Sequence, residues 1–168
     1  VLAIRSSTTW FDFDFSDIDT LYIDPELLHV CIDNLTFGPS IIKVGVDIKP
    51  GGDENPVNLG SKGVLPVAVL TTADFDALSI DDDTLEFGDP ETETGGVVNP
   101  LRTSEEDVDD DGDVDLVLHF SIPELVDADA LDADSVGAVL TGLTVDDRAF
   151  IGADVVRIVP PKGKGKKK

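Results

Sequence analysis

The sequence predicts an all-β protein: an antiparallel β-sandwich of the Ig-like or jelly-roll kind with one short helical turn. Three observations support this prediction. Short stretches alternate between apolar and polar residues, as strands with one buried face do. Turn-forming residues separate these stretches at short intervals. Helical periodicity is almost absent from the 168 residues.

The first segment, residues 1–38, reads as three or four strands. Phe11, Phe13 and Phe15 alternate with two aspartates, a pattern typical of a strand with one apolar and one acidic face. Further β-type stretches follow before the turn at 38–40. So few strands are not stable alone. We therefore expect residues 1–38 to complete a partial β-sandwich, within this chain or in another subunit.

A second unit, residues 41–160, begins with a strand over 42–48, where β-branched residues alternate with lysine, glycine or aspartate. A short strand is expected at 57–59. The stretch 64–70 is almost continuously apolar, as in a buried sandwich strand. Pro66 lies inside this stretch and predicts an edge strand or a bulge, because proline cannot donate to a sheet ladder.

The middle of the second unit contains the predicted helical turn, over 73–76, which the Thr71-Thr72 pair can cap. A strand at 85–87 and a loop over 89–99 follow. The stretch 114–122 predicts a strong strand, with leucines, a phenylalanine and an isoleucine on one face.

The last predicted strands cover 136–145 and 153–159, with a turn at 146–147. Residues 161–168 contain five lysines and form a low-complexity basic tail that we expect to be flexible. This tail is either a solvated terminus or an electrostatic strap onto an acidic neighbour, such as another copy of the protein.

Acidic residues outnumber basic ones by 35 to 12, which gives a formal net charge of −23. This balance argues against nucleic acid as a partner, and no apolar stretch is long enough to cross a bilayer. Residues 74–134 hold 22 acidic side chains and a single basic one, Arg102. Such crowding opposes folding by self-repulsion. Bound cations or a saline habitat would relieve it. The lysine-rich tail fits a halophilic composition poorly, so we favour bound cations.

The strongest local signal is an aspartate-rich loop over 107–115. Its candidate metal ligands are Asp107, Asp109, Asp111, Asp113 and Asp115. Carboxylates at positions 1, 3, 5 and 9, with glycine at position 6, match a calcium loop, since Ca²⁺ takes six to eight oxygen ligands. Asp113, at position 7, can offer its backbone carbonyl. Position 12 is a leucine within a strand, so this is calcium-loop geometry without the second helix of an EF-hand.

Other acidic residues have plainer interpretations. The run 81–83 lacks alternate spacing and a glycine, which favours a cap or turn. Asp12 and Asp14 are explained by an exposed strand face, although a cation or a sugar is the alternative. Glu105 and Glu106 either complete the calcium shell or lie exposed. The alternative for the loop itself is a solvated acidic turn.

Several motifs resemble a recurrent β-sandwich domain of secreted bacterial and archaeal proteins. They are V-D-I-K-P-G-G at 46–52, N-L-G-S-K-G-V-L-P-V-A-V-L-T at 58–71, D-L-V-L-H-F at 115–120, L-T-G-L-T at 140–144 and F-I-G-A-D-V-V-R-I-V at 150–159. The aspartate loop resembles those of integrin-type β-propellers. The resemblance implies a non-catalytic β-sandwich that is appended to large extracellular proteins and has no settled activity.

The end of the first segment, I-D-N-L-T-F-G at 32–38, resembles the closing strands of a jelly-roll domain of secreted surface proteins. That resemblance implies that the strands of 1–38 belong to a longer precursor or complete a neighbouring subunit.

We therefore expect a non-catalytic, calcium-stabilised structural or adhesive module that self-associates, or binds other matrix or surface proteins. Strand addition would build extracellular fibres. No nucleophile elbow, Cys-His pair or phosphate loop is present to suggest an enzyme. The alternative is a carbohydrate-binding accessory module with a polysaccharide partner. Trp10 and Tyr22 are the only aromatic residues beyond phenylalanine for such a platform.

Overall fold

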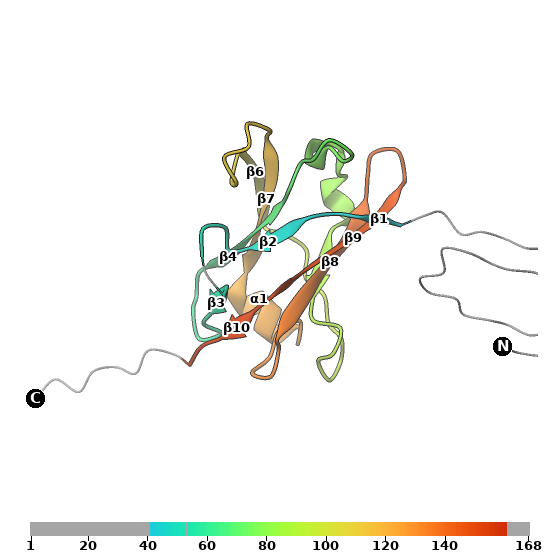
Figure 1. Cartoon of the computed structure of the whole chain (residues 1–168). Coiled ribbons are helices and arrows are strands. Elements are labelled where there is room, and N and C mark those ends of the chain that lie inside the picture. The colour runs from blue at the N-terminus through green and yellow to red at the C-terminus, as the bar shows by residue number, and fades with distance from the viewer. Residues whose placement is uncertain (1–40, 53, 161–168) are drawn as a thin grey trace, which may run out of the picture. The chain divides into compact units, whose positions relative to one another are not determined.

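A computed structural model describes residues 41–52 and 54–160, which form an all-β sandwich (Figure 1). The strands are β1 (Ile42–Lys43), β2 (Val46–Ile48), β3 (Pro56–Val57), β4 (Val64–Val69), β5 (Glu86–Gly88), β6 (Arg102–Glu106), β7 (Asp115–Ser121), β8 (Gly137–Leu143), β9 (Ala149–Val155) and β10 (Arg157–Ile158). The 3₁₀ turns are η1 (Ala77–Ser79) and η2 (Asp82–Thr84), and α1 (Ile122–Asp127) is an α-helix. The predicted strands in 1–38 and the basic tail 161–168 lie outside the described residues.

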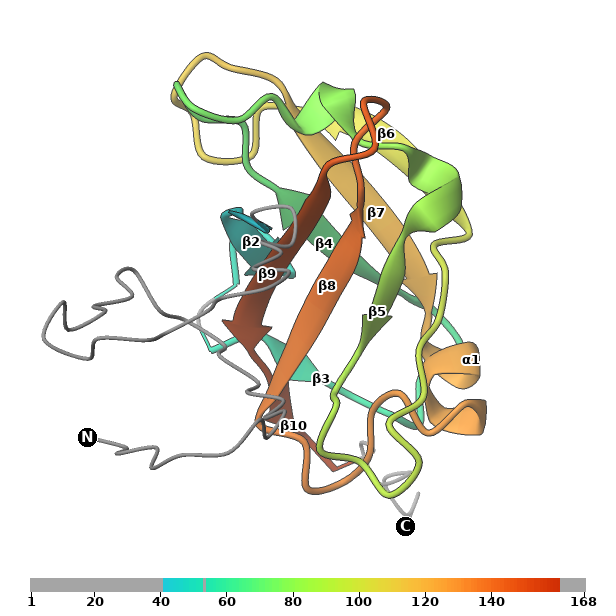
Figure 2. The ribbon, with the colours of Figure 1, turned by 90° about the vertical axis from the view of Figure 1, so that its right-hand side faces the viewer.

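Two four-stranded sheets face each other, with strand orders β1-β9-β8-β5 and β2-β4-β7-β6. Figure 2 shows β9, β8 and β5 in front of β4 and β7. When β2, β4, β5, β6, β7, β8 and β9 are lettered A to G, the sheets read A-B-E-D and G-F-C. This is the order of a constant-type Ig domain. The pairs β1·β9 and β10·β3 are parallel, and the others are antiparallel.

The core lies between the sheets and is built on phenylalanine. The rings of Phe87 and Phe120 stack with centroids 4.6 Å apart, and those of Phe75 and Phe150 tilt at 6.0 Å. On β7, Leu116, Leu118 and Phe120 face this core, as their alternation predicted. Within the described residues, no helix is long and apolar enough to span a membrane.

The predicted strand over 42–48 is divided between the two sheets. β1 pairs with β9 in one sheet, and β2 pairs with β4 in the other. The chain changes sheets at Val44 and Gly45, where the Val44 N–H donates to β9 and the Gly45 carbonyl accepts from Leu70. A period of two identifies extended backbone, but it does not show which neighbour the backbone pairs with.

The prediction for Pro66 is wrong, because β4 is a central strand with regular pairing to β7 on one side and to β2 on the other. The Pro66 carbonyl accepts from the Lys49 N–H at 2.8 Å, directly after β2 ends at Ile48. Nitrogen and carbonyl of one strand residue face the same side. The N–H that Pro66 lacks would therefore face the β2 side, just beyond the end of this short strand, so the proline costs the sheet a single hydrogen bond.

The predicted helical turn lies further along the chain. Thr72 and Phe75 close a tight turn through two backbone hydrogen bonds of 2.7 and 3.2 Å. The 3₁₀ turn follows at η1, where the carboxylate of Asp76 accepts from the Leu78 N–H. Aspartate and threonine are both good N-cap residues. Asp76, and not Thr71 or Thr72, is the residue that directly precedes the observed 3₁₀ turn.

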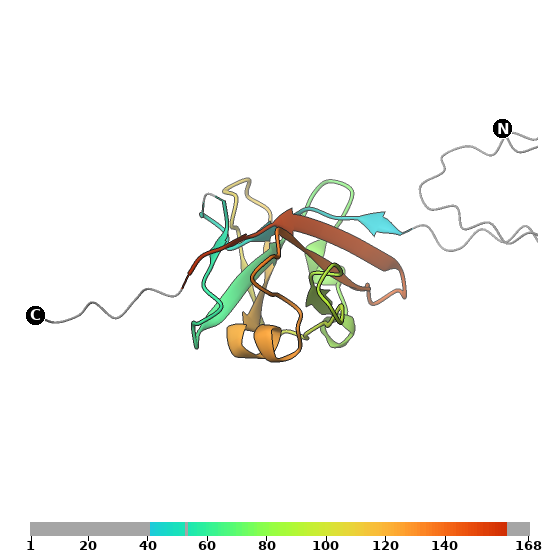
Figure 3. The same cartoon turned by 90° about the horizontal axis from the view of Figure 1, so that it is seen from below.

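The single predicted helical turn also understates the helical content. The chain leaves β7 directly into α1, whose first residue, Ile122, was predicted as the end of the strand over 114–122. Ser121 caps α1 by accepting from the Glu124 N–H. Figure 3 views the sandwich from the end where α1 lies, and Figure 1 shows the β6–β7 loop at the opposite end.

Candidate metal centre

The aspartate loop connects β6 to β7, at the end of the sandwich that it shares with η1, η2 and the β8–β9 turn (Figure 1). Two of its residues adopt left-handed backbone, Asp110 at φ 61° and Gly112 at φ 98°. Glycine takes this conformation without steric cost, and aspartate tolerates it better than most residues. Glycine at position 6 of the loop therefore allows a sharp turn at Gly112.

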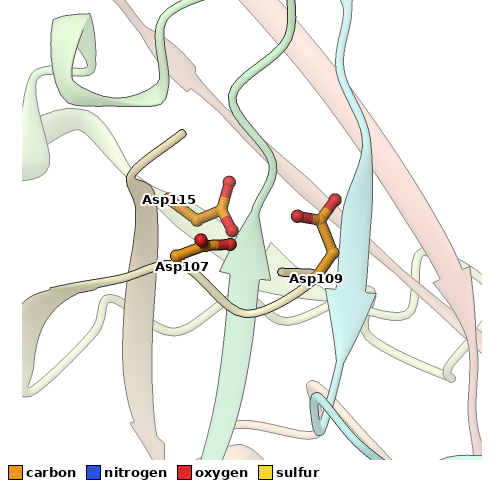
Figure 4. Close-up of side chains that lie close together, drawn as sticks. All are labelled: Asp107, Asp109 and Asp115. Atoms are coloured by element: carbon orange, nitrogen blue, oxygen red, sulfur yellow. The ribbon is translucent and has the colours of Figure 1, made fainter. Parts of the chain in front are cut away.

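Three carboxylates of the loop converge, as Figure 4 shows. Asp107, Asp109 and Asp115 each offer one oxygen atom, and these oxygens lie within 4.8 Å of one another. Asp107 and Asp109 are exposed, whereas Asp115 is fully buried at the start of β7. The group therefore joins the solvent-facing loop to the base of a core strand.

Asp115 is held by the backbone on both of its oxygen atoms. Oδ1 accepts from the Thr71 N–H at 2.8 Å, and Oδ2 accepts from the Val108 N–H at 2.9 Å. Burial of an ionised carboxylate is costly unless hydrogen bonds or charges compensate for it. Each carboxylate oxygen has a second acceptor site, so Asp115 retains capacity to bind a cation.

Hydrogen bonds within the loop set the direction of the other carboxylates. Asp107 Oδ2 accepts from the Gly112 N–H at 3.1 Å, which closes the loop across its mouth. Asp109 Oδ1 accepts from the Asp111 N–H at 3.3 Å, and Asp111 Oδ1 accepts from the Asp113 N–H at 2.9 Å. These short-range bonds curl the backbone so that Asp107 and Asp109 point toward Asp115.

The crowding of carboxylates also affects their ionisation. Desolvation, with the charges of Asp111, Asp115 and Asp107, raises the pKa of Asp109, and the Asp111 N–H opposes the rise. A bound cation would offset the repulsion within the group. All donor atoms are oxygens, which suits hard cations and not soft transition metals. The group could hold a metal ion.

The five predicted ligands do not all join this group. Asp111 and Asp113 are exposed and are not among the three that converge. Their roles as ligands, including the carbonyl of Asp113, stay predictions. Glu105 and Glu106 are exposed on β6. Asp81 caps η2 by accepting from the Asp83 N–H, which confirms the capping interpretation of that run.

Sequence reasoning missed Thr71, which binds Asp115 through its backbone from 44 residues away. No local pattern signals this contact, because it depends on β4 and β7 lying side by side. Comparison with protein-family models and with curated proteins gives no match for this chain.

Proposed function

We propose that this protein is a non-catalytic structural or adhesive module of a secreted or cell-surface protein, stabilised by Ca²⁺. The observation that carries the proposal is the convergence of Asp107 and Asp109 on the buried Asp115. A cation there would tie the β6–β7 loop to a core strand. Ca²⁺ suits several carboxylates on a flexible loop, whereas Mg²⁺ keeps several waters and demands near-ideal octahedral geometry.

A hydrolytic role has little support among the described residues. Ser104 and His119 are hydrogen-bonded at 3.1 Å, but His119 Nδ1 is buried and has no partner in the described part. A nucleophile-base pair needs a third group to orient the imidazole. Burial, followed by the charge of Arg102, lowers the pKa of His119. This pair is better explained as a bond between β6 and β7.

A carbohydrate platform also lacks support in this part of the chain. Its aromatic side chains are Phe75, Phe87, Phe120 and Phe150, and all four are buried. Trp10 and Tyr22 lie outside the described residues. Carbohydrate platforms use exposed aromatic rings, so we propose the structural role alone.

We also propose that copies of the protein associate by adding a strand of one copy to a sheet of another. β6 is the outermost strand of its sheet, and among the described residues no strand pairs with its second edge. Such an edge can accept a strand from another chain. The net charge of −23 means that copies repel one another unless cations or the lysine tail intervene.

The calcium proposal is tested by isothermal titration of Ca²⁺ into the protein and two variants. Asp109→Asn removes one charge from the converging group but keeps the oxygen that accepts from Asp111. Asp110→Asn removes a charge from the same loop outside that group, and asparagine tolerates its positive φ. We expect Asp109→Asn to weaken binding by about tenfold or more, and Asp110→Asn by about threefold or less. Equal effects, or no saturable binding, would contradict the proposed site.

A further inference from the structure

Thr71, two residues beyond the end of β4, links the aspartate loop to the β4–β5 connection. Its N–H donates to Asp115 Oδ1 at 2.8 Å, and its hydroxyl donates to the Val114 carbonyl at 2.6 Å. The same hydroxyl accepts from the Ala77 N–H at 3.1 Å. One residue therefore bonds both the base of the candidate metal site and the start of η1.

The chain between Thr71 and η1 is short and closed on itself. Thr72 and Phe75 exchange two backbone hydrogen bonds, and Asp76 caps η1. Ala77 is fully buried, so its N–H needs a partner within the protein. The Thr71 hydroxyl supplies that partner, which makes the position of η1 depend on the position of Thr71.

Asp115 is the point where the cation would act on this arrangement. Without a cation, three carboxylates with oxygens within 4.8 Å of one another repel, and in the described part of the chain the Asp115 carboxylate is held by the Thr71 and Val108 N–H groups. A cation bound to the three carboxylates would replace this repulsion with attraction and fix Asp115. Fixing Asp115 would then restrict Thr71, and through it η1.

We propose that Thr71 is a positioning residue through which cation binding at the aspartate loop orders the β4–β5 connection. This inference rests on the calcium proposal above. The connection forms one wall of a groove of about 340 Å³, whose other wall is β6 together with Leu116 of β7. The Thr103 hydroxyl donates to Asp82 Oδ2 at 2.9 Å between these walls. Ordering the connection would therefore fix the shape of the groove.

The test is amide hydrogen exchange on the full chain, with saturating Ca²⁺ and with excess chelator. In the wild type we expect residues 77–84 to exchange about tenfold more slowly with Ca²⁺ than without it. Thr71→Val removes the hydroxyl and keeps the N–H bond to Asp115. We expect this variant to keep calcium-dependent protection over 107–114 but to reduce the effect at 77–84 to about twofold or less. Thr71→Ser restores the hydroxyl and should restore the effect.

The outcomes separate this inference from the calcium proposal. If the titration detects no Ca²⁺ binding to the wild type, both fail. If Ca²⁺ binds and protects 107–114 but leaves exchange at 77–84 unchanged, the role of Thr71 is overturned and the calcium proposal stands. If folded Thr71→Val shows the same calcium-dependent protection at 77–84 as the wild type, the role of Thr71 is likewise overturned. If Thr71→Val does not fold, the wild type and Thr71→Ser still test the inference. Thr71→Ser keeps the hydroxyl, so loss of calcium-dependent protection at 77–84 in this variant would also overturn the role of Thr71.

Discussion

Asp115 connects the core of the sandwich to the candidate site. It is the first residue of β7, is fully buried and accepts one backbone N–H on each oxygen. Charge-assisted hydrogen bonds of this kind are about twice as strong as neutral ones. They keep a carboxylate at the edge of the core, where it also meets two exposed carboxylates of the loop.

Asp47 and Asp154 form an acidic pair that predicts how the stability of the protein varies with pH. Asp154 on β9 accepts from the Ile48 N–H and from the Asn55 amide. Desolvation, followed by the charge of Asp154, raises the pKa of Asp47 above its ordinary 3.8. The folded state therefore disfavours ionised Asp47. This cost is present above the raised pKa and disappears as the pH falls through it toward 3.8.

We therefore predict that Asp47→Asn stabilises the protein at pH 7. The expected gain is roughly 0.3 kcal/mol, because solvent screens this partly exposed group. The gain should vanish near pH 3.5. Urea unfolding at both pH values and constant ionic strength measures it, with Asp146→Asn in the exposed β8–β9 turn as the control for net charge. A gain that is equal at the two pH values, or equal in the control, would refute the assignment.

The converging aspartates were predictable from sequence because they belong to one short loop. The spacing of Asp107, Asp109 and Asp115 around Gly112 determines a local curl. Thr71 could not be predicted, because its contact with Asp115 depends on the pairing of β4 with β7. Local chemistry is visible in a sequence, whereas partners across a sheet are not.

At the scale of elements, the crossing between β1 and β2 depends on a glycine in β9. A Cβ atom at Gly152 would lie 2.3 Å from Val46 Cγ2 and 2.9 Å from Val44 Cγ2. These two valines are on the segment that passes from one sheet to the other. The absence of a side chain at Gly152 lets that segment pack directly onto β9.

We predict that Gly152→Ala lowers the free energy of unfolding by about 1–3 kcal/mol through overpacking. Gly45→Ala is a matched control in the crossing itself, because its Cβ would make an ordinary 3.4 Å contact with Leu70. Urea unfolding at neutral pH compares the two variants. If Gly152→Ala is as stable as Gly45→Ala, close packing of the crossing on β9 is not required.

Elements differ in how far the sequence predicts them. β7 follows from its leucines and phenylalanine at every second residue, and β8 and the turn at 146–147 were also predicted. The strand predicted over 153–159 was misplaced, because β9 already begins at Ala149 and the end of the predicted range, β10, pairs with β3 in another sheet. α1 carried a readable signal, since Ser121 and Glu124 have capping-box spacing with proline between them. β6 carried none, because its sequence R-T-S-E-E is polar on both faces and its strand is formed by pairing with β7.

At the scale of the whole molecule, charge is the main property to explain. A net charge of −23 disfavours both compact folding and association of like copies. General screening by salt would reduce the repulsion everywhere, but a bound divalent cation neutralises it at one place. We propose that this place is the end of the sandwich that carries the aspartate loop.

We predict that calcium controls assembly of the full chain. Negative-stain electron microscopy of the purified protein should show fibres in Ca²⁺ that come apart when a chelator is added. Mg²⁺ at the same concentration is the control, because the proposed site favours the larger cation. Dispersed small particles under every condition would rule out self-assembly and leave the module as a passive domain.

We propose above all that Ca²⁺ stabilises this sandwich through the aspartate loop, a claim that urea unfolding with and without Ca²⁺ can check. The chelated sample should be brought to equal ionic strength with NaCl, so that screening of the acidic surface is matched. At a free Ca²⁺ concentration one hundred times the dissociation constant, we expect the wild type to gain about 2.7 kcal/mol in free energy of unfolding. Asp109→Asn should show a much smaller gain at the same concentration. Equal stability of the wild type in Ca²⁺ and in matched NaCl would contradict the claim.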